Sequence, residues 1–168
     1  MSIIAVKKDK QYVTFVSDTQ VTQGWNKSNK DNIKLTKVGQ VIVGSAGKVK
    51  TAKLFILFLS EVQPGILETE LDVIRLFRNF ESWLVDNKVG KDIDLADNDF
   101  LINFKDKVFK VEDGYLISEV ENFDAIGSGY DKALMGLELG FDIQKVVRIV
   151  CKFDLYCSEP IKVIKRKL

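Results

Sequence analysis

The first 47 residues place the strongest limit on the fold, because two β-hairpins are expected there before any helix. Residues 3–8 and 11–17 are rich in β-branched and aromatic side chains, and a short turn separates them. Residues 33–38 and 41–45 form a second pair that is joined at Gly39-Gln40. Because the first strand begins at residue 3, we expect the N-terminus to lie inside the fold, whereas most chains leave theirs frayed.

The rest of the chain alternates between pairs of helices and groups of strands. Apolar residues at helical spacing predict four helices: residues 48–62, 70–84, 130–139 and 143–153. Short β-rich segments between turns predict five more strands: residues 100–105, 108–112, 115–120, 155–157 and 161–164. Three further segments are expected to be loops or turns: residues 18–24, 26–32 and 125–129. The apolar run 54–59 predicts that the first helix is buried on more than one side, between layers or against a neighbouring subunit.

This order of elements restricts the fold class. Tight turns join the strands in pairs, which favours mainly antiparallel sheets, and two helix pairs can cover the outer faces of two stacked sheets. We therefore predict an α+β fold, a four-layer αββα sandwich. The length and the absence of linkers predict that residues 1–168 form a single domain.

Composition excludes several classes of function. The sequence has no histidine, which excludes Ser-His and Cys-His catalysis and most zinc sites. The 25 basic and 24 acidic residues leave a net charge of +1, so neither nucleic acid nor an anionic membrane is an expected partner. Cys151 and Cys157 lie in no paired motif and are expected to be free thiols. No apolar run is long enough to span a bilayer. We expect a cytoplasmic protein without a metal ion or cofactor.

Four residues near the N-terminus point to hydrolytic chemistry. Ser2, Asp18 and Lys34 are sixteen residues apart in each step, and Gly47 follows the strand at 41–45. An N-terminal serine carries its own base, because an α-amine with a pKa of about 7.7–8.0 can accept the proton of the hydroxyl. A lysine kept charged by an aspartate would lower the pKa of both groups, and a backbone N–H at the glycine suits an oxyanion donor. The structural alternative is that Asp18 and Lys34 form an ion pair that only stabilises a hairpin.

Motifs in the same order along the chain resemble a known family. They are the Ser2, Asp18, Lys34 and Ser45-Ala46-Gly47 pattern, residues 18–24 (DTQVTQG), residues 125–129 (AIGSG) and residues 154–157 (DLYC). Together they are similar to the N-terminal-nucleophile (Ntn) hydrolases of the proteasome β type, the HslV-like peptidases included. The resemblance covers nearly the whole chain, and it implies the same αββα sandwich in one proteasome-subunit-like domain.

The resemblance also implies catalytic roles. Ser2 would occupy the nucleophile position, which this family usually fills with threonine. Asp18 and Lys34 would form the charge pair, and Gly47 would supply the oxyanion donor. The N-terminal amine would be supported by three later residues: Ser128, Asp154 and Cys157.

Substrate and partners follow from the same resemblance. An extended peptide would bind along Thr22 and Gly47 through backbone hydrogen bonds, with Ser45 at the first specificity pocket. The function implied is that of a threonine-type protease family member, a peptidase subunit that hydrolyses peptide bonds inside a ring. The family forms homo-oligomeric rings of six or seven subunits, which an ATP-driven unfoldase often caps.

Departures from the family pattern leave alternatives open. Lys48 stands where a second glycine is usual, and an alignment with one inserted residue in the turn at Asp9 would place Met1 at the nucleophile position. If Met1 is retained, Ser2 has no free amine, and the chain would be a non-catalytic structural or assembly subunit with the same fold. An amidohydrolase acting on a small amide is a third possibility. Ser128 could equally be the cap of the helix that follows it.

Overall fold

The computed structural model describes residues 2–23, 26–29, 34–89 and 93–168. Its strands are β1 (Ile4–Lys8), β2 (Tyr12–Asp18), β3 (Gln20–Gln23), β4 (Asn26–Asn29), β5 (Leu35–Val38), β6 (Val41–Gly47), β7 (Asn98–Phe104), β8 (Lys107–Glu112), β9 (Leu116–Glu119), β10 (Phe123–Ile126) and β11 (Ile161–Lys167). Its helices are α1 (Val49–Val62), α2 (Glu70–Asp86), α3 (Tyr130–Glu138) and α4 (Ile143–Phe153), with a short 3-10 helix, η2 (Leu95–Asp97), before β7.

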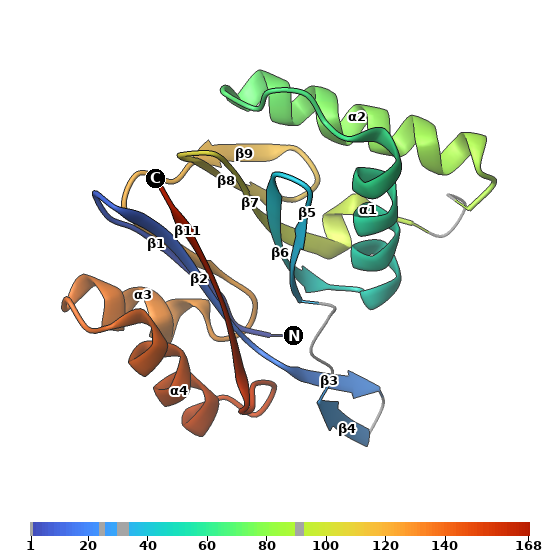
Figure 1. The fold of residues 1–168 in the computed structure, drawn as a ribbon. Helices are drawn as coiled ribbons and strands as arrows, with labels where there is room; N and C mark the ends of the chain where they lie inside the picture. Colours follow the sequence, from blue (N-terminus) through green and yellow to red (C-terminus); the bar gives the residue numbers. More distant parts are fainter. Residues whose placement is uncertain (1, 24–25, 30–33, 90–92) are drawn as a thin grey trace.

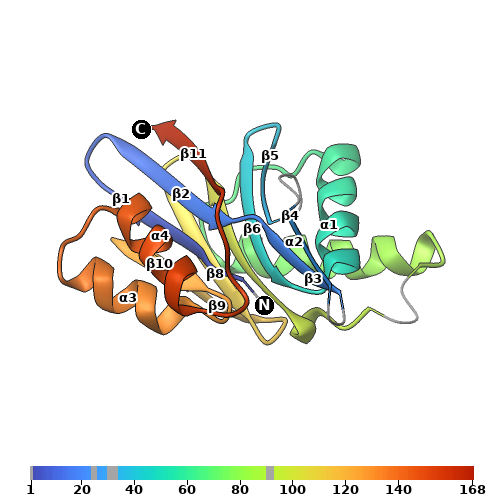
Figure 2. The same ribbon diagram turned by 90° about the horizontal axis from the view of Figure 1, so that it is seen from below.

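Two antiparallel sheets form the inner layers. One sheet has the strand order β10-β1-β2-β11, and the other has the order β5-β6-β7-β8-β9. Helices α3 and α4 cover the outer face of the first sheet, and α1 and α2 cover the outer face of the second (Figure 1). Figure 2 shows the same layers from below. The four-layer αββα sandwich predicted from the sequence is confirmed.

The N-terminal segment lies in the middle of the first sheet. Strand β1 pairs with β2 on one side and with β10 on the other. Its residues alternate between the two faces of the sheet: Ile3 and Ala5 pack under α3 and α4, while Ile4 and Val6 point into the space between the sheets. Residues 3–6 have no exposed surface. The start of the chain is therefore fixed by burial on both faces, as the sequence predicted.

Apolar packing and helix caps explain the helical layers. Under α1 and α2, the ring of Phe55 lies 5.0 Å from the rings of Phe77 and Phe100, centroid to centroid, so the aromatic residues of these helices are core. Helix α2 begins with a capping box between Thr69 and Asp72. Helix α4 has Asp142 as its N-cap, and the side chain of Asp142 accepts two backbone N–H bonds.

Several sequence predictions are corrected by the fold. Residues 18–24 and 26–32 were expected to be loops, but β3 and β4 pair as a two-stranded sheet, with residues 24–25 and 30–33 outside the described part of the chain. Residues 125–129 were expected to form a turn, but residues 125 and 126 are the last two residues of β10, which pairs with β1. Residues 155–157 form a turn and not a strand.

Helix α1 also differs from its prediction. It packs on its sheet and on α2, and Leu57 on its remaining face is 45% exposed. The helix therefore does not lie between two layers of this chain, and burial against a neighbouring subunit stays a prediction. No helix in the described ranges is long and apolar enough to cross a membrane.

Candidate active site

A buried ion pair lies at the centre of the candidate site. The ammonium of Lys34 donates to both carboxylate oxygens of Asp18, each at 2.7 Å. Asp18 is completely buried at the end of β2, and the side chain of Lys34 is only 8% exposed. The carboxylate also accepts the backbone N–H of Ile3 at 3.0 Å and that of Gln20 at 3.0 Å, with a longer contact of 3.4 Å from Ser158. These donors satisfy a charge that could not otherwise be buried.

Ser2 lies two residues before β1 and shares a cavity with the ion pair. Ser2 and Lys34 both line this cavity, which has a volume of about 50 Å³. Ser2 is 3% exposed, and its carbonyl oxygen accepts the backbone N–H of Gly129 at 3.2 Å. A Cβ at Gly127 would lie 2.3 Å from that carbonyl oxygen, and the backbone of Gly127 has a φ of +91°. The glycine-rich turn after β10 therefore holds the backbone of Ser2 in place, because only glycine permits such a close approach.

The turn between β6 and α1 forms another wall of the cavity. Ser45, Gly47 and Lys48 all line it, as do Val49 and Ala52 at the start of α1. Gly47 has a φ of +133°, and a Cβ there would lie 2.2 Å from the carbonyl oxygen of Asp97. A glycine is thus required at the position predicted to supply the oxyanion donor. The unpaired N–H groups at the start of a helix also favour negative charge in this place.

Thr22 and Gln20 complete the lining on the side of β3. The side-chain amide of Gln20 donates to the hydroxyl of Thr22 at 3.1 Å and to the carbonyl oxygen of Leu155 at 3.3 Å. Gln20 is 2% exposed, although β3 continues out of the sandwich toward β4. The amide therefore ties the strand beside the cavity to the turn after α4.

Ser128, Asp154 and Cys157 form a second cluster beside Ser2. The hydroxyl of Ser128 lies 3.1 Å from Asp154 Oδ1 and 3.4 Å from the carbonyl oxygen of Ser2, and the thiol of Cys157 donates to Asp154 Oδ1 at 3.5 Å. Burial raises the pKa of Asp154, but hydrogen bonds from the N–H of Tyr156, from Lys132 and from its two cluster partners outweigh it, so its pKa lies below 3.8. We expect the carboxylate to be ionised at neutral pH.

Ser128 does not cap the helix that follows it, as one alternative had predicted. Helix α3 has Gly129 as its N-cap and no side-chain capping bond.

The two cysteines are free thiols, as expected. Cys151 lies on α4 and is half-buried, and burial raises the pKa of its thiol to about 12. Burial also raises the pKa of the Cys157 thiol. Both thiols are therefore protonated and unreactive at neutral pH.

The structure brings together the residues that the sequence singled out, in two groups. Ser2, Thr22, Lys34, Ser45 and Gly47 line one cavity, with Asp18 bound to Lys34 behind it. The second group consists of residues 128, 154 and 157, and its Ser128 hydroxyl donates to the carbonyl oxygen of Ser2. That this group supports the N-terminal amine stays a prediction. Met1, on which the choice between an active and an inactive site depends, lies outside the described residues.

Asn98 is a polar residue of the cavity that the sequence did not single out. It ends the polar stretch 87–98, and in the structure it is the first residue of β7, is 1% exposed and lines the cavity. Its side-chain amide donates to the hydroxyl of Ser45 at 3.1 Å. The only sequence signal was its place between a polar stretch and an apolar strand, which also fits an ordinary loop residue.

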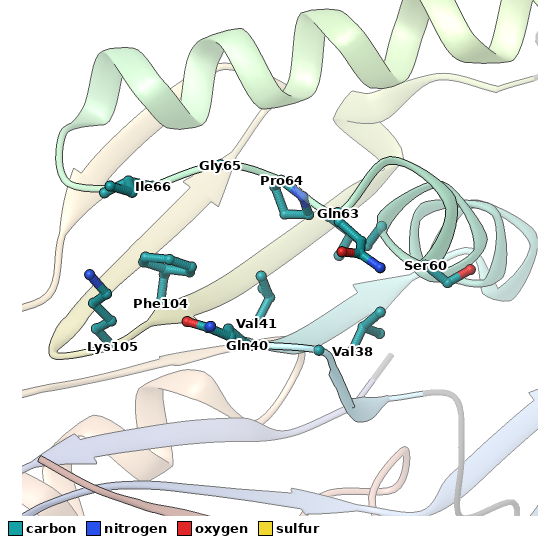
Figure 3. A pocket seen from close by; sticks show the side chains of 12 residues that line it. Val38, Gln40, Val41, Ser60, Gln63, Pro64, Gly65, Ile66, Phe104 and Lys105 are labelled. Atoms are coloured by element: carbon teal, nitrogen blue, oxygen red, sulfur yellow. The ribbon is translucent and has the colours of Figure 1, made fainter.

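A larger pocket, of about 600 Å³, lies at the other end of β6. It is formed by the β5–β6 turn at Gln40, the segment after α1 at Pro64 and Ile66, and Phe104 with Lys105 at the end of β7 (Figure 3). Its lining includes the hydroxyl of Ser60 and the ammonium of Lys105, but no carboxylate that could pair with that ammonium. Within residues 2–23, 26–29, 34–89 and 93–168, no group of three or more Cys, Asp or Glu side chains could hold a metal ion. Of the catalytic candidates, Ser2, Lys34 and Gly47 line the smaller cavity and none lines the larger one.

Comparison with known proteins adds evidence on the fold. Neither a protein-family model nor a curated protein sequence matches this chain. Among solved structures, it is similar to Thiobacillus denitrificans BPH, with 19% identity and a TM-score of 0.83 over 99% of this chain and 98% of that one. The same protein in complex with epoxomicin matches with 18% identity and a TM-score of 0.85, again over 99% and 98% of the two chains.

A third match is to eukaryotic HslV from Trypanosoma brucei, with 16% identity and a TM-score of 0.72 over 99% of both chains. All three identities are below 20%, so the likeness concerns the arrangement of the backbone. The described elements, their antiparallel sheets and these matches lead to one conclusion. The chain has the HslV and proteasome type of N-terminal-nucleophile hydrolase fold.

Proposed function

We propose that this chain is a peptidase subunit in which Ser2, once Met1 has been removed, is the N-terminal nucleophile. The observation that carries the proposal is the placement of Ser2 and Lys34 on one cavity, with Lys34 held by the buried carboxylate of Asp18. A fixed ammonium beside a serine hydroxyl favours the alkoxide, which is the reactive form. Removal of Met1 would place the base, the α-amine, on the same residue as the hydroxyl.

The reaction would proceed by acyl transfer. The hydroxyl oxygen of Ser2 attacks the scissile carbonyl carbon while its proton passes to the α-amine. The carbonyl oxygen becomes an oxyanion, which the N–H of Gly47 would stabilise. When the C–N bond breaks, the departing amine takes the proton from the α-ammonium and leaves an ester on Ser2. Water then attacks the ester, gives a proton to the α-amine and releases the carboxylic acid, and the proton returns to the hydroxyl.

Substrate, assembly and location belong to the same proposal. An extended peptide would lie between Thr22 and Gly47, with its side chain directed toward Ser45. We propose that residues 1–168 act as one domain in a cytoplasmic homo-oligomeric ring of six or seven copies, supplied by an ATP-driven unfoldase. Exposed apolar side chains on the outer helices support contacts with other copies: Leu57, Val62, Ile149 and Phe153.

The proposal is tested by mass and by covalent labelling. We expect the purified chain to lack the mass of Met1 and to gain one molecule of a peptide epoxyketone, a probe that needs both a hydroxyl and a free amine. Ser2→Ala and Lys34→Ala should each abolish labelling and cleavage of peptide substrates. Ser60→Ala and Lys53→Ala, two changes on helix α1 outside the cavity lining, are the matched controls and should behave like the unmodified chain.

Each alternative function predicts a different outcome of these experiments. A retained Met1 with no labelling would favour the non-catalytic subunit. Turnover of small amides without cleavage of any peptide would favour the amidohydrolase. Peptide cleavage that survives Ser2→Ala would reject this assignment of the site.

A further inference from the structure

One buried side-chain amide joins the two sides of the turn that carries Gly47. The amide nitrogen of Asn98 donates to Ser45 Oγ at 3.1 Å and to the carbonyl oxygen of Lys48 at 3.2 Å. Its Oδ1 accepts the backbone N–H of Lys48 at 3.1 Å. Gly47 is thus flanked on both sides by residues that are bonded to the same amide, and it lies opposite Asn98 in the register of β6 and β7.

Two other features of the turn restrain it less strongly than this amide. Gly47 has a φ of +133°, and glycine is the residue with the most backbone freedom to lose. The N-cap of α1, Lys48, makes no side-chain capping bond. An ion pair of 2.6 Å joins its ammonium to Asp97, but both side chains are exposed to solvent, at 59% and 38%. Exposed pairs of this kind restrain a backbone weakly, so the buried amide is the stronger restraint.

Close packing adds to the hydrogen bonds. A Cβ at Gly47 would lie 2.7 Å from Cγ of Asn98 and 2.8 Å from its Cα. The amide plane therefore occupies the space that any other residue at position 47 would need. Asn98 is 1% exposed, so water does not compete for these bonds.

The bond to the N–H of Lys48 has a chemical consequence. Two consecutive residues of the turn, Gly47 and Lys48, line the cavity, and each carries a backbone N–H. The second is bonded to Asn98 Oδ1, so it is not available to an oxyanion. The amide of Gly47 is left as the oxyanion donor of this turn, and its direction depends on the two residues that Asn98 holds.

We propose that Asn98 is a positioning residue that sets the orientation of the Gly47 amide for catalysis. The inference rests on the proposed peptidase function. Because an oxyanion exists only in the transition state, loss of this orientation should lower kcat and leave KM nearly unchanged. Removal of one oxyanion donor lowers kcat by about 100- to 1,000-fold, so we expect misplacement of the donor to lower it by roughly 10- to 100-fold.

The test compares Asn98→Ala and Asn98→Asp with a control in the same strand. Asn103 is also in β7 and completely buried, and its amide also donates to two backbone carbonyl oxygens, at 2.8 Å each. Asn103→Ala should destabilise the fold without changing kcat. Asn98→Asp keeps the acceptor for the N–H of Lys48 but cannot donate to the carbonyl oxygen of Lys48, so it should recover only part of the kcat lost in Asn98→Ala. Activity is measured on N-capped peptide–aminocoumarin substrates with each of the twenty residues before the scissile bond.

Hydrogen exchange of the Lys48 amide provides a readout that does not need activity. We expect this amide to exchange at least tenfold faster in Asn98→Ala than in the unmodified chain, and at an unchanged rate in Asn103→Ala. If exchange and kcat are unchanged in Asn98→Ala while the unmodified chain is active, the positioning role is wrong and the peptidase stands. If the unmodified chain is inactive and unlabelled, the peptidase proposal and the catalytic role of Asn98 both fall, even where exchange at Lys48 responds as expected.

Discussion

Removing either member of the buried Asp18–Lys34 pair should destabilise the protein, and by unequal amounts. Lys34→Met leaves the carboxylate of Asp18 buried, but three backbone N–H groups still donate to it. Asp18→Ala leaves the ammonium of Lys34 with 8% exposure and no carboxylate, and the same three N–H groups lose their acceptor. The second change therefore removes more compensating interactions than the first.

The magnitudes follow from these contacts. Breaking a buried ion pair at one end costs about 3–5 kcal/mol, and we assign Lys34→Met to the lower end, about 3 kcal/mol. Asp18→Ala should cost about 5 kcal/mol or more, because each buried N–H left without a partner adds roughly 1–3 kcal/mol. For a chain of this length, 1 kcal/mol corresponds to a change in Tm of about 2–4 °C. The expected losses in Tm are therefore about 6–12 °C and at least about 10–20 °C.

Urea unfolding at pH 7, followed by circular dichroism, measures these differences. The double variant should lose less stability than the sum of the two single losses, because it leaves no unpaired charge. Lys53→Ala, on the exposed face of α1, should change the free energy of unfolding by no more than about 0.5 kcal/mol. The reasoning is refuted if Asp18→Ala is milder than Lys34→Met, or if either change costs less than about 1 kcal/mol.

Two further predictions concern the walls of the cavity. Gly47→Ala should lower the free energy of unfolding in urea by about 2–4 kcal/mol, because of steric overlap and left-handed backbone strain. Gly39 has a φ of +55° and no atom within 4 Å of a new Cβ, so Gly39→Ala should cost only about 1–2 kcal/mol. Equal losses in the two variants would contradict this prediction. Asp154→Asn should destabilise the protein at pH 7, and this loss should become smaller as the pH falls below 3.8. A carboxylate with a lowered pKa stabilises the fold above pH 3.8 and loses that contribution as pH falls through its folded-state pKa. A loss that stays the same as the pH falls would show that the charge of Asp154 has no part in it.

Local features account for the elements that could be predicted from the sequence. The hairpin of β1 and β2 and the start of α4 at Asp142 each depend on residues within a few positions of one another. The spacing of Ser2, Asp18 and Lys34 was also informative. The fold brings Ser2 and Lys34 to one cavity and places Asp18 against Lys34.

Long-range pairing decided the strands and side-chain contacts that the sequence did not predict. Strand β10 is a strand because it lies beside β1, and the polar residues of β3 and β4 pair with each other although their own β-propensity is low. Ser128 has a helix-capping position in the sequence, but its hydroxyl bonds to Asp154, 26 residues later. Asn98 meets Ser45 across 53 residues, a contact that no periodicity encodes.

The sequence by itself therefore determined the layers and the set of chemically capable residues. Propensity, periodicity and capping act over a few residues and are written in the local order of side chains. Tertiary structure alone decided which polar groups meet around the cavity, because a buried amide, hydroxyl or carboxylate takes whichever partner the packing of the two sheets brings within hydrogen-bond distance.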